Sequence, residues 1–421
     1  MKTTVELLEK HPKVSDYKIN IHQKETCELF FVKGKLETVR STDTCDKQVT
    51  VYVDHDGCKG DSQFFIYPST TAEQVADLID DAVEKALLIH NQDYSLPGAE
   101  SGEFAVESNF RDYAASDLAA LISKTVFDAN TVENGSLNSV EVFINKHTET
   151  VRNSRGLHKT QVRYDAMVEA IPTYNGEKMS VELYEQYNFS SLDLNVLSAE
   201  IAGKMEEVKA RFEAVTPDMP ISCDVVLNKL ELAQLFGSIA QNLNYSAVYS
   251  HSNLWNKNDL IQKQITGDPI SITMAGEVPG SVRSAKFDDD GMSLGSIRIV
   301  EAGKAVNYYG ANRFGQYLKE VPTGNLGCIC VEPGTAGIPT GAYLEVVSMS
   351  GLQVDFFSDY IGGEIRLAYY HDGTKTVPVT GVSVSGKASE VLGAIRLSGK
   401  TAIHNGYVGP EKAVLSTMKI F

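Results

Sequence analysis

Histidine and cysteine side chains are the residues best suited to hold a metal ion, and in this chain they are widely spaced. The nine histidines never come closer than His11 and His22, which are eleven residues apart. A helical zinc motif needs two imidazoles about one turn apart, so that both reach the same ion. Cys328 and Cys330 have no second cysteine pair at ligand spacing, and their spacing is typical of two inward positions on one buried strand. The sequence therefore contains no zinc motif.

Other catalytic and ion-binding motifs are also missing. The chain has no G-x-S-x-G, no P-loop and no G-x-G-x-x-G after a strand. Asp288-Asp289-Asp290-Gly291 resembles the start of a calcium loop, but the last ligand position of such a loop falls on Ile299, where a bidentate Glu is required. We therefore predict a polar turn that enters the hairpin, with a weak anionic or backbone-capping role of the aspartates as the alternative.

The overall charge argues against nucleic acid as a direct partner. The chain has 421 residues, with 38 Lys and Arg against 55 Asp and Glu, a net charge of −17 and a pI near 5.0. Binding to phosphates requires a basic stripe. The most basic stretch, residues 152–163, is diluted by strand-like residues, and we predict a solvated strand and turn there.

Three further features predict a cytoplasmic protein that is not attached to a membrane. No apolar run approaches the roughly 18 residues that a membrane-spanning helix needs. The first twenty residues lack the apolar core of a signal peptide. Six cysteines are too few for a disulfide scaffold, so we expect reduced thiols.

The elements that must position any site begin with an internal repeat. Residues 36–42 (LETVRST) are echoed by residues 148–154 (TETVRNS), and each segment follows an apolar run and precedes an alternating one. We predict a duplicated unit of antiparallel sheet packed by helices, with copies at about 1–92 and 112–214. Amphipathic helices are expected at 72–90, 112–129 and 197–214, and a linker at 91–108.

The remainder, residues 215–421, is predicted to be a second domain rich in short strands. A strand at 223–227 precedes one core helix at 230–243, and residues 297–306 alternate around an Ala-Gly turn as a hairpin does. Gly237 lies in the middle of the helix, where we expect it to mark close approach of another element. The fold class is therefore α+β, with domains at 1–214 and 215–421.

Several segments resemble, in their order and spacing, the TldD/PmbA family, whose members were once called modulators of DNA gyrase. The resemblance extends over the whole chain, and six segments in one order are more specific than any one of them. These segments are VRNSRGL at 151–157, KFDDDGMSLGSIRIVEAGKAVNYYG at 286–310, PTGN at 322–325, SGLQVDFFSDYIGGEI at 350–365, PVTGVSVSGKASEVLGAI at 378–395 and GYVGP at 406–410.

The resemblance implies a cytosolic two-subunit zinc metalloprotease. In that family the TldD-type subunit carries HExxxH on the helix after the domain boundary and a cysteine ligand near the C-terminus. In this chain Gly237, Ser238 and Asn242 fall at the three motif positions, and residues 404–412 contain no cysteine. These side chains hold zinc poorly and cannot act as a general base. The chain thus resembles the PmbA (TldE) type of subunit, with no catalytic residues and no metal or other cofactor of its own.

Three functions follow as hypotheses. In the first, the chain joins a TldD-type subunit that bears zinc, and the pair cleaves unfolded or extended peptides. Ser350, Gly351 and Gly362 would then offer a sheet edge or wall to the peptide, and the chain would form a homodimer when the partner is absent. The second is a stand-alone hydrolase with a different metal site, built from His371, Asp372 and His404. The third is a peptide-binding module with no catalytic partner.

Overall fold

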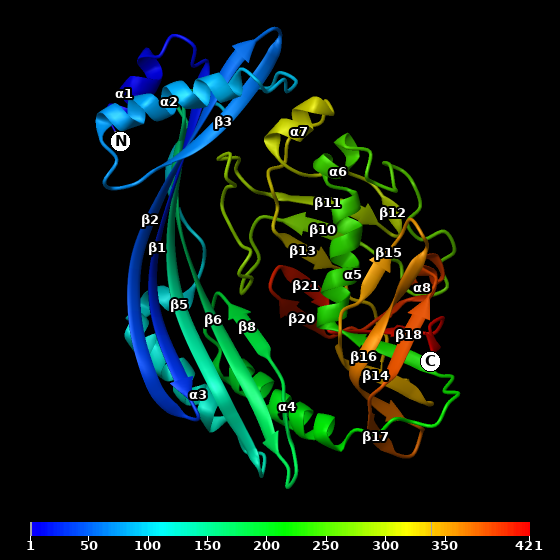
Figure 1. The fold of residues 1–421 in the computed structure, drawn as a ribbon. Coiled ribbons are helices and arrows are strands. Elements are labelled where there is room, and N and C mark those ends of the chain that lie inside the picture. Colours follow the sequence, from blue (N-terminus) through cyan, green and yellow to red (C-terminus); the bar gives the residue numbers. More distant parts are fainter. Residues whose placement is uncertain (1, 338) are drawn as a thin grey trace.

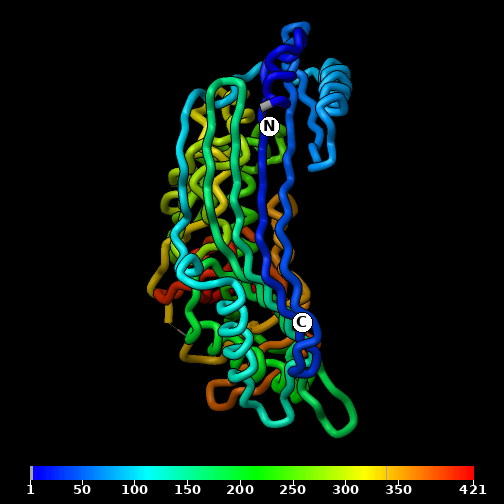
Figure 2. The backbone as a smooth tube through the Cα atoms, turned by 90° about the vertical axis from the view of Figure 1, so that its left-hand side faces the viewer, coloured from blue at the N-terminus to red at the C-terminus, as the bar shows by residue number. Residues whose placement is uncertain are grey.

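The computed structural model describes residues 2–337 and 339–421, and it has the predicted α+β architecture. A long twisted sheet from the first half of the chain lies along one side of the molecule, and the β-rich second half lies beside it (Figure 1). The long strands run side by side over most of the length of the molecule, with the second half behind them (Figure 2). No helix in these residues is long and apolar enough to cross a membrane.

The first half forms one eight-stranded sheet in the order β3-β2-β1-β5-β6-β4, with β7 and β8 also paired to β6. Its elements are α1 (Lys2–Lys10), β1 (Asp16–Val32), β2 (Lys35–His55), β3 (Cys58–Ile66), α2 (Ala72–Ala86), β4 (Ser101–Ala105), the short 3₁₀ helix η1 (Asn109–Asp112), α3 (Ala115–Asp128), β5 (Gly135–Asn153), β6 (His158–Asn175), β7 (Ser180–Glu182), β8 (Glu185–Phe189) and α4 (Leu194–Glu213).

The predicted duplication is confirmed at the level of these elements. The order α1-β1-β2-β3-α2 is repeated as α3-β5-β6-β8-α4, and the copies join through antiparallel pairing of β1 with β5. The two similar heptapeptides are nevertheless not equivalent, because residues 36–42 begin the second strand of their copy and residues 148–154 end the first strand of theirs. The expected linker also differs, since it contains β4, which pairs in parallel with β6.

Local sequence explains why the helices form where they do. Thr71 begins α2 with a capping box, in which its side chain accepts a hydrogen bond from the backbone of Gln74 and the Gln74 side chain accepts one from Thr71. The apolar stripe of α2 packs on β2 and β3, and α3 and α4 pack together against β5 and β6. Each copy therefore buries one face of its strands beneath its own helices.

The second half contains two sheets around one long helix. The sheets have the orders β12-β11-β10-β13-β21-β20 and β19-β22-β9-β14-β16-β18-β23, and β15 and β17 pair with β16. The elements are β9 (Asp224–Asn228), α5 (Lys229–Asn242), α6 (Tyr245–Tyr249), β10 (Ile272–Ala275), β11 (Ser296–Glu301), β12 (Lys304–Ala305), α7 (Asn312–Tyr317), β13 (Cys328–Val331), β14 (Tyr343–Met349), β15 (Gln353–Asp355), β16 (Tyr360–His371), β17 (Thr376–Val379), β18 (Val382–Gly386), α8 (Ala388–Ala394), β19 (Arg396–Leu397), β20 (Thr401–His404), β21 (Tyr407–Pro410), β22 (Lys412–Leu415) and β23 (Lys419–Ile420).

The sequence found the main features of this half and missed its smallest ones. The hairpin β11–β12 turns at Ala302 and Gly303, both with positive φ, as its Ala-Gly signal predicted. The short helices α6, α7 and α8 were not predicted, because five to seven residues are too few to show a helical period. The division into domains at residues 214 and 215 stays a prediction.

Helix α5 is the core helix of this half, as its apolar spacing predicted. Leu232, Leu235, Phe236 and Ile239 are fully buried in one cluster. The expectation of a close approach at Gly237 is wrong, since an added Cβ would lie 3.8 Å from its nearest neighbour, Ile329, which is ordinary contact.

We therefore expect Gly237→Ala to raise the free energy of unfolding by about 1 kcal/mol, because alanine favours the helix interior and meets no clash. Urea denaturation followed by circular dichroism measures the change. As a control, Gly362→Ala should destabilise the fold, because its Cβ would lie 2.5 Å from the Val384 carbonyl oxygen. Destabilisation by Gly237→Ala would show that an unseen constraint acts on α5.

Candidate functional site

A cavity of about 510 Å³ lies between the long sheet and a loop of the second half. The sheet contributes side chains from β1, β2, β3, β5 and β6. The second half contributes residues 282–285, 287–289 and 294, together with Asn325 and Gly327. The polar groups that matter below are Asn20, His22, Glu149, Gln161, Arg163 and Asp288.

Two of the segments that carry the family resemblance meet at this cavity. Asp288 of the DDDG segment accepts hydrogen bonds from the backbone N–H groups of Asp290 and Met292, both at 3.0 Å, and from that of Asn325 in the PTGN segment at 2.9 Å. Burial, together with the nearby Asp290 charge, raises the pKa of Asp288 to about 6. The predicted polar turn is present at Asp289 and Asp290, and its Asp288 carboxylate also caps backbone N–H groups, which ties together segments that are 37 residues apart.

The loop at residues 282–293 contacts β1 and β6 of the sheet through ion pairs and hydrogen bonds. Lys18 forms an ion pair with Asp290 at 2.5 Å. Gln161 accepts a hydrogen bond from the Lys286 backbone N–H at 2.8 Å. Lys159 is fully buried and donates to the Gly291 carbonyl at 3.0 Å and to Ser293 at 2.7 Å. The two halves therefore share a polar interface beside the cavity.

The prediction of a solvated strand and turn at 152–163 is wrong for Lys159 and Arg163, whereas His158 at the start of β6 is exposed. Lys159 forms an ion pair with Glu100 at 2.6 Å in addition to its contacts with the loop, and Arg163 binds Glu149 at 2.7 Å. The alternating pattern was interpreted correctly as a strand. The second half of the chain covers one face of that strand. The local sequence of the strand does not show which face this is.

A chain of three titratable side chains crosses the sheet next to the cavity. His22 and His147 approach each other with 3.0 Å between Nε2 and Nδ1. His147 Nε2 lies 2.7 Å from the Asp165 carboxylate, which also accepts a hydrogen bond from Asn145 at 2.6 Å. Burial raises and the hydrogen bond from His147 lowers the pKa of Asp165, and the net shift is downward, so this carboxylate is charged at neutral pH.

Glu149 lies next to this chain, with one oxygen 3.9 Å from His22 Nε2. Burial alone would raise its pKa, but the hydrogen bonds and charge of Arg163, with a hydrogen bond from Gln161, lower it. The pKa of His22 is lowered mainly by burial, and the Glu149 charge only partly opposes this. The site thus combines a carboxylate fixed by Arg163 and Gln161 with two adjacent imidazole rings. Sequence spacing missed it, because His22 and His147 are 125 residues apart and meet only through the pairing of β1 with β5.

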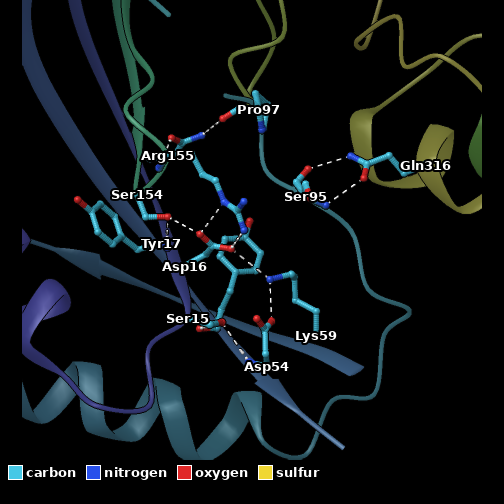
Figure 3. Close-up of polar contacts among 12 residues, drawn as sticks. Ser15, Asp16, Tyr17, Asp54, Lys59, Ser95, Pro97, Ser154, Arg155 and Gln316 are labelled. Atoms are coloured by element: carbon cyan, nitrogen blue, oxygen red, sulfur yellow. Dashed lines mark hydrogen bonds and ion pairs between the residues drawn. The ribbon is translucent and has the colours of Figure 1, made fainter. Parts of the chain in front are cut away.

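A second polar network supports the same end of the sheet (Figure 3). The buried carboxylate of Asp16 forms ion pairs with Lys59 at 3.2 Å and with Arg155 at 2.9 Å. It also accepts a hydrogen bond from the Ser154 hydroxyl at 2.6 Å. Lys59, which is only 1% exposed, also binds Asp54 at 2.7 Å. The network holds the start of β1 against β3 and against the turn between β5 and β6.

Gly237, Ser238 and Asn242, which the sequence resemblance assigns to the zinc-motif positions, lie in the second half of α5. The Ser238 hydroxyl donates to the Gln234 carbonyl at 2.9 Å, and Asn242 donates to the Ser238 carbonyl and accepts from the Leu254 N–H at 2.8 Å. Gly237 has no side chain to contribute. Strand β21 packs beside this helix through the parallel rings of Phe236 and Tyr407. The Ser238 and Asn242 side chains therefore make hydrogen bonds within the fold.

The residues predicted to touch a peptide lie in and around β15 and β16. Ser350 binds the Glu364 carbonyl through its backbone N–H at 2.9 Å, and Gly351 has a φ of +134° with open space around it. Gly362 pairs with Gln353 on one side and Ser385 on the other, so it offers no free edge. A free edge does occur on β2, where Lys35–Asp46 has no partner strand on the side away from β1 among the described residues. Contact of these three residues with a peptide stays a prediction.

The structure does not bring His371, Asp372 and His404 together as a metal site. His371 lies 3.5 Å from Glu345, and Asp372 accepts hydrogen bonds within its own turn, from Thr374 and Lys375. His404 lies on β20 and contacts Asn405. Among residues 2–337 and 339–421, the side-chain groups close enough to hold a metal ion are His22, His147 and Glu149, and His55, Asp56 and His90.

Comparison with known proteins places this fold. Residues 220–420 match the family model of the PmbA/TldA metallopeptidase C-terminal domain. No curated protein sequence matches the chain. Among solved structures, TldE from Thermococcus kodakarensis is similar with a TM-score of 0.80 and 14% identity, over 100% of this chain and 98% of that one. A putative modulator of DNA gyrase from Bacteroides thetaiotaomicron has a TM-score of 0.79 and 12% identity, over 100% and 97% of the two chains.

A second putative modulator of DNA gyrase, from Thermotoga maritima, is similar with a TM-score of 0.76 and 15% identity, over 100% of this chain and 99% of that one. At these identities the three structures establish a common fold over the whole length. The match at 220–420 covers the segments in which the sequence resemblance is densest. Residues 220–420 therefore belong to the family of PmbA/TldA metallopeptidase C-terminal domains, and the whole chain has the fold of TldE and of the two putative modulators of DNA gyrase.

Proposed function

We propose that this chain is the non-catalytic, PmbA (TldE)-type subunit of a two-subunit metalloprotease. It associates with a TldD-type subunit that carries the zinc, and the pair acts on unfolded or extended peptides in the cytoplasm. The observation that carries the proposal is the state of α5 within a metallopeptidase domain: Gly237, Ser238 and Asn242 supply neither a zinc ligand set nor a general base.

The free edge of β2 supports association with another chain. Lys35–Asp46 exposes a row of backbone N–H and C=O groups, and Leu36 and Val39 on it are more than half exposed. An unpaired strand of this length is a template for pairing with another strand. We assign this edge to the contact with the partner subunit, or with a second copy of this chain when the partner is absent.

The test is reconstitution with a TldD-type subunit from the same organism. We expect the chain alone to hydrolyse a labelled unfolded protein no faster than buffer, and the mixture to hydrolyse it at a rate that depends on the partner's zinc. Sedimentation should show a mixed complex, and a homodimer of this chain alone. Zinc-dependent hydrolysis by this chain alone would contradict the proposal. Failure to form any mixed complex would favour a stand-alone peptide-binding module.

The proposed peptide wall has its own test at Ser350. Gly351 has a positive φ and Gly362 has no space for a side chain, so substitutions there disturb the fold itself. Ser350→Trp adds bulk at an exposed position, and we expect it to lower the peptidase activity of the pair while association stays intact. Ser69→Trp, in an exposed turn of the first half, is the matched control and should change neither property. Equal activity of both variants would remove Ser350 from the substrate path.

A further inference from the structure

We propose that His22, His147 and Glu149 form a binding site for a zinc-like divalent transition metal, separate from the helix where the family's motif lies. One ligand atom from each of the three side chains lies within 4.8 Å of the other two. The site belongs to the long sheet, and it lies at the wall of the 510 Å³ cavity that the second half closes. This inference goes against the expectation, drawn from the local sequence, that the chain holds no metal.

The spacing of the ligand atoms suits a tetrahedral ion. With zinc–nitrogen bonds of about 2.0–2.1 Å, two ligand nitrogens in a tetrahedral site lie about 3.3 Å apart. His22 Nε2 and His147 Nδ1 are 3.0 Å apart, and Glu149 Oε1 is 3.9 Å from His22 Nε2. The His22 side chain is 41% exposed and can therefore move to adjust these separations when an ion binds.

The partners of each ligand orient it for a cation. Asp165 accepts the proton on His147 Nε2, which leaves the lone pair of Nδ1 directed toward His22. A carboxylate behind a ligand histidine is the usual arrangement at protein metal sites, because it fixes the tautomer and makes the imidazole a better ligand. Arg163 and Gln161 hold the Glu149 carboxylate in place by donating hydrogen bonds to its two oxygens.

The charge and openness of the cavity agree with this assignment. Its lining carries the carboxylates of Asp46, Glu149, Asp288 and Asp289 against the guanidinium groups of Arg163 and Arg283. Two imidazoles and one carboxylate favour zinc, cobalt or nickel over calcium and magnesium, which prefer all-oxygen sites. Three protein ligands leave a fourth position, open to the cavity, for water or a small anionic ligand.

The second ligand group in the chain provides a matched comparison. His55, Asp56 and His90 also lie close together, but Asp56 and His90 are exposed, and the His55 ring already binds the Ile89 carbonyl at 3.0 Å. Neither imidazole of this group has a carboxylate behind it like that of Asp165 behind His147. We therefore expect the strong site to be the one at His22, His147 and Glu149.

The experiment is calorimetric titration of the chelator-stripped full-length chain with zinc chloride alone. We expect one site per chain, with a Kd below about 10 µM. His22→Gln and Glu149→Gln should each weaken binding by more than tenfold, and Asp165→Asn, which only orients His147, by about 10–100-fold. His90→Gln should leave the affinity unchanged. His22 is partly exposed, so its variant keeps the fold, and a thermal melt of each variant checks this.

Absence of a site this tight, or equal zinc affinity of the wild type and of His22→Gln and Glu149→Gln in folded protein, would overturn the assignment. Loss of the affinity in His90→Gln alone would move the site to the second group. The titration uses this chain by itself and measures binding, so its result is independent of whether a TldD-type subunit pairs with the chain or cleaves peptides.

Discussion

Replacing Asp16 with alanine is expected to lower the free energy of unfolding by about 3–5 kcal/mol, the cost of leaving a buried charge without its partner. The Asp16 carboxylate forms ion pairs with the ammonium group of Lys59 and the guanidinium group of Arg155, and Lys59 is 1% exposed. Asp54 remains beside Lys59 in the variant, but its side chain is 54% exposed and replaces only part of the lost interaction. Urea denaturation followed by circular dichroism measures the loss.

The control for Asp16→Ala is Asp81→Ala. Asp81 also forms an ion pair with a lysine, Lys85, but both side chains are more than half exposed. Surface pairs of this kind contribute at most about 1 kcal/mol, so the control should change stability little. Equal effects of the two substitutions would mean that burial of the Lys59–Asp16 pair adds nothing to stability.

The decrease in the free energy of unfolding at acidic pH should depend on the same Asp16 carboxylate. Burial would raise the pKa of Asp16, but hydrogen bonds from Arg155 and Ser154 and the charge of Lys59 lower it below its ordinary value of 3.8. Because the pKa of Asp16 is lower in the folded state, its contribution to the free energy of unfolding is complete above about pH 4. The contribution is lost as the pH falls further. The difference in stability between the wild type and Asp16→Ala should therefore shrink below pH 4.

The second large effect is expected at Glu231, and its sign is opposite. Glu231 lies in the first turn of α5, buried, and one of its carboxylate oxygens has no hydrogen-bond partner. Burial raises its pKa from 4.5 to about 7, although backbone N–H groups of its own residue and of Asn228 lower it in part. The folded state thus binds a proton on Glu231 in a pH range where the unfolded state releases it.

For a raised pKa, the stabilising contribution is complete below about pH 4.5 and is lost as the pH rises through 7. Glu231→Gln keeps the shape of the protonated side chain and does not titrate. We therefore expect the variant to match the wild type near pH 4.5 and to be more stable at pH 8, by on the order of 3 kcal/mol. Urea denaturation at both pH values measures the difference.

Exposed Glu84 on α2 is the control for Glu231, and Glu84→Gln should show no such dependence on pH. If Glu231→Gln changed the free energy of unfolding by the same amount at pH 8 and at pH 4.5, the effect would come from packing and not from the proton. A loss of stability at pH 8 would show that the charged carboxylate has a partner in solution. Either result would contradict the assigned cause.

The sequence by itself determined the elements whose cause is local. The amphipathic pattern predicted α2, and the capping box of Thr71 and Gln74 that starts it is local too, because it involves only residues three positions apart. The spacing of Leu232, Leu235 and Phe236 predicted α5 as a core helix, since a helical stripe appears within a few turns. The family resemblance, carried by short segments in order, was equally accessible and is confirmed by the match at 220–420.

Tertiary structure decided everything that depends on which residues meet across strands. His22 and His147 are 125 residues apart and come within 3.0 Å only because β1 pairs with β5 across the join of the two copies. Lys159 is buried only because the loop at Gly291 covers its face of β6. Alternation along a strand tells which residues share a face, but the identity of the covering surface is set by long-range packing. The physical reason is that capping and helical periodicity act over a few residues, whereas the composition of a cavity depends on contacts between distant segments.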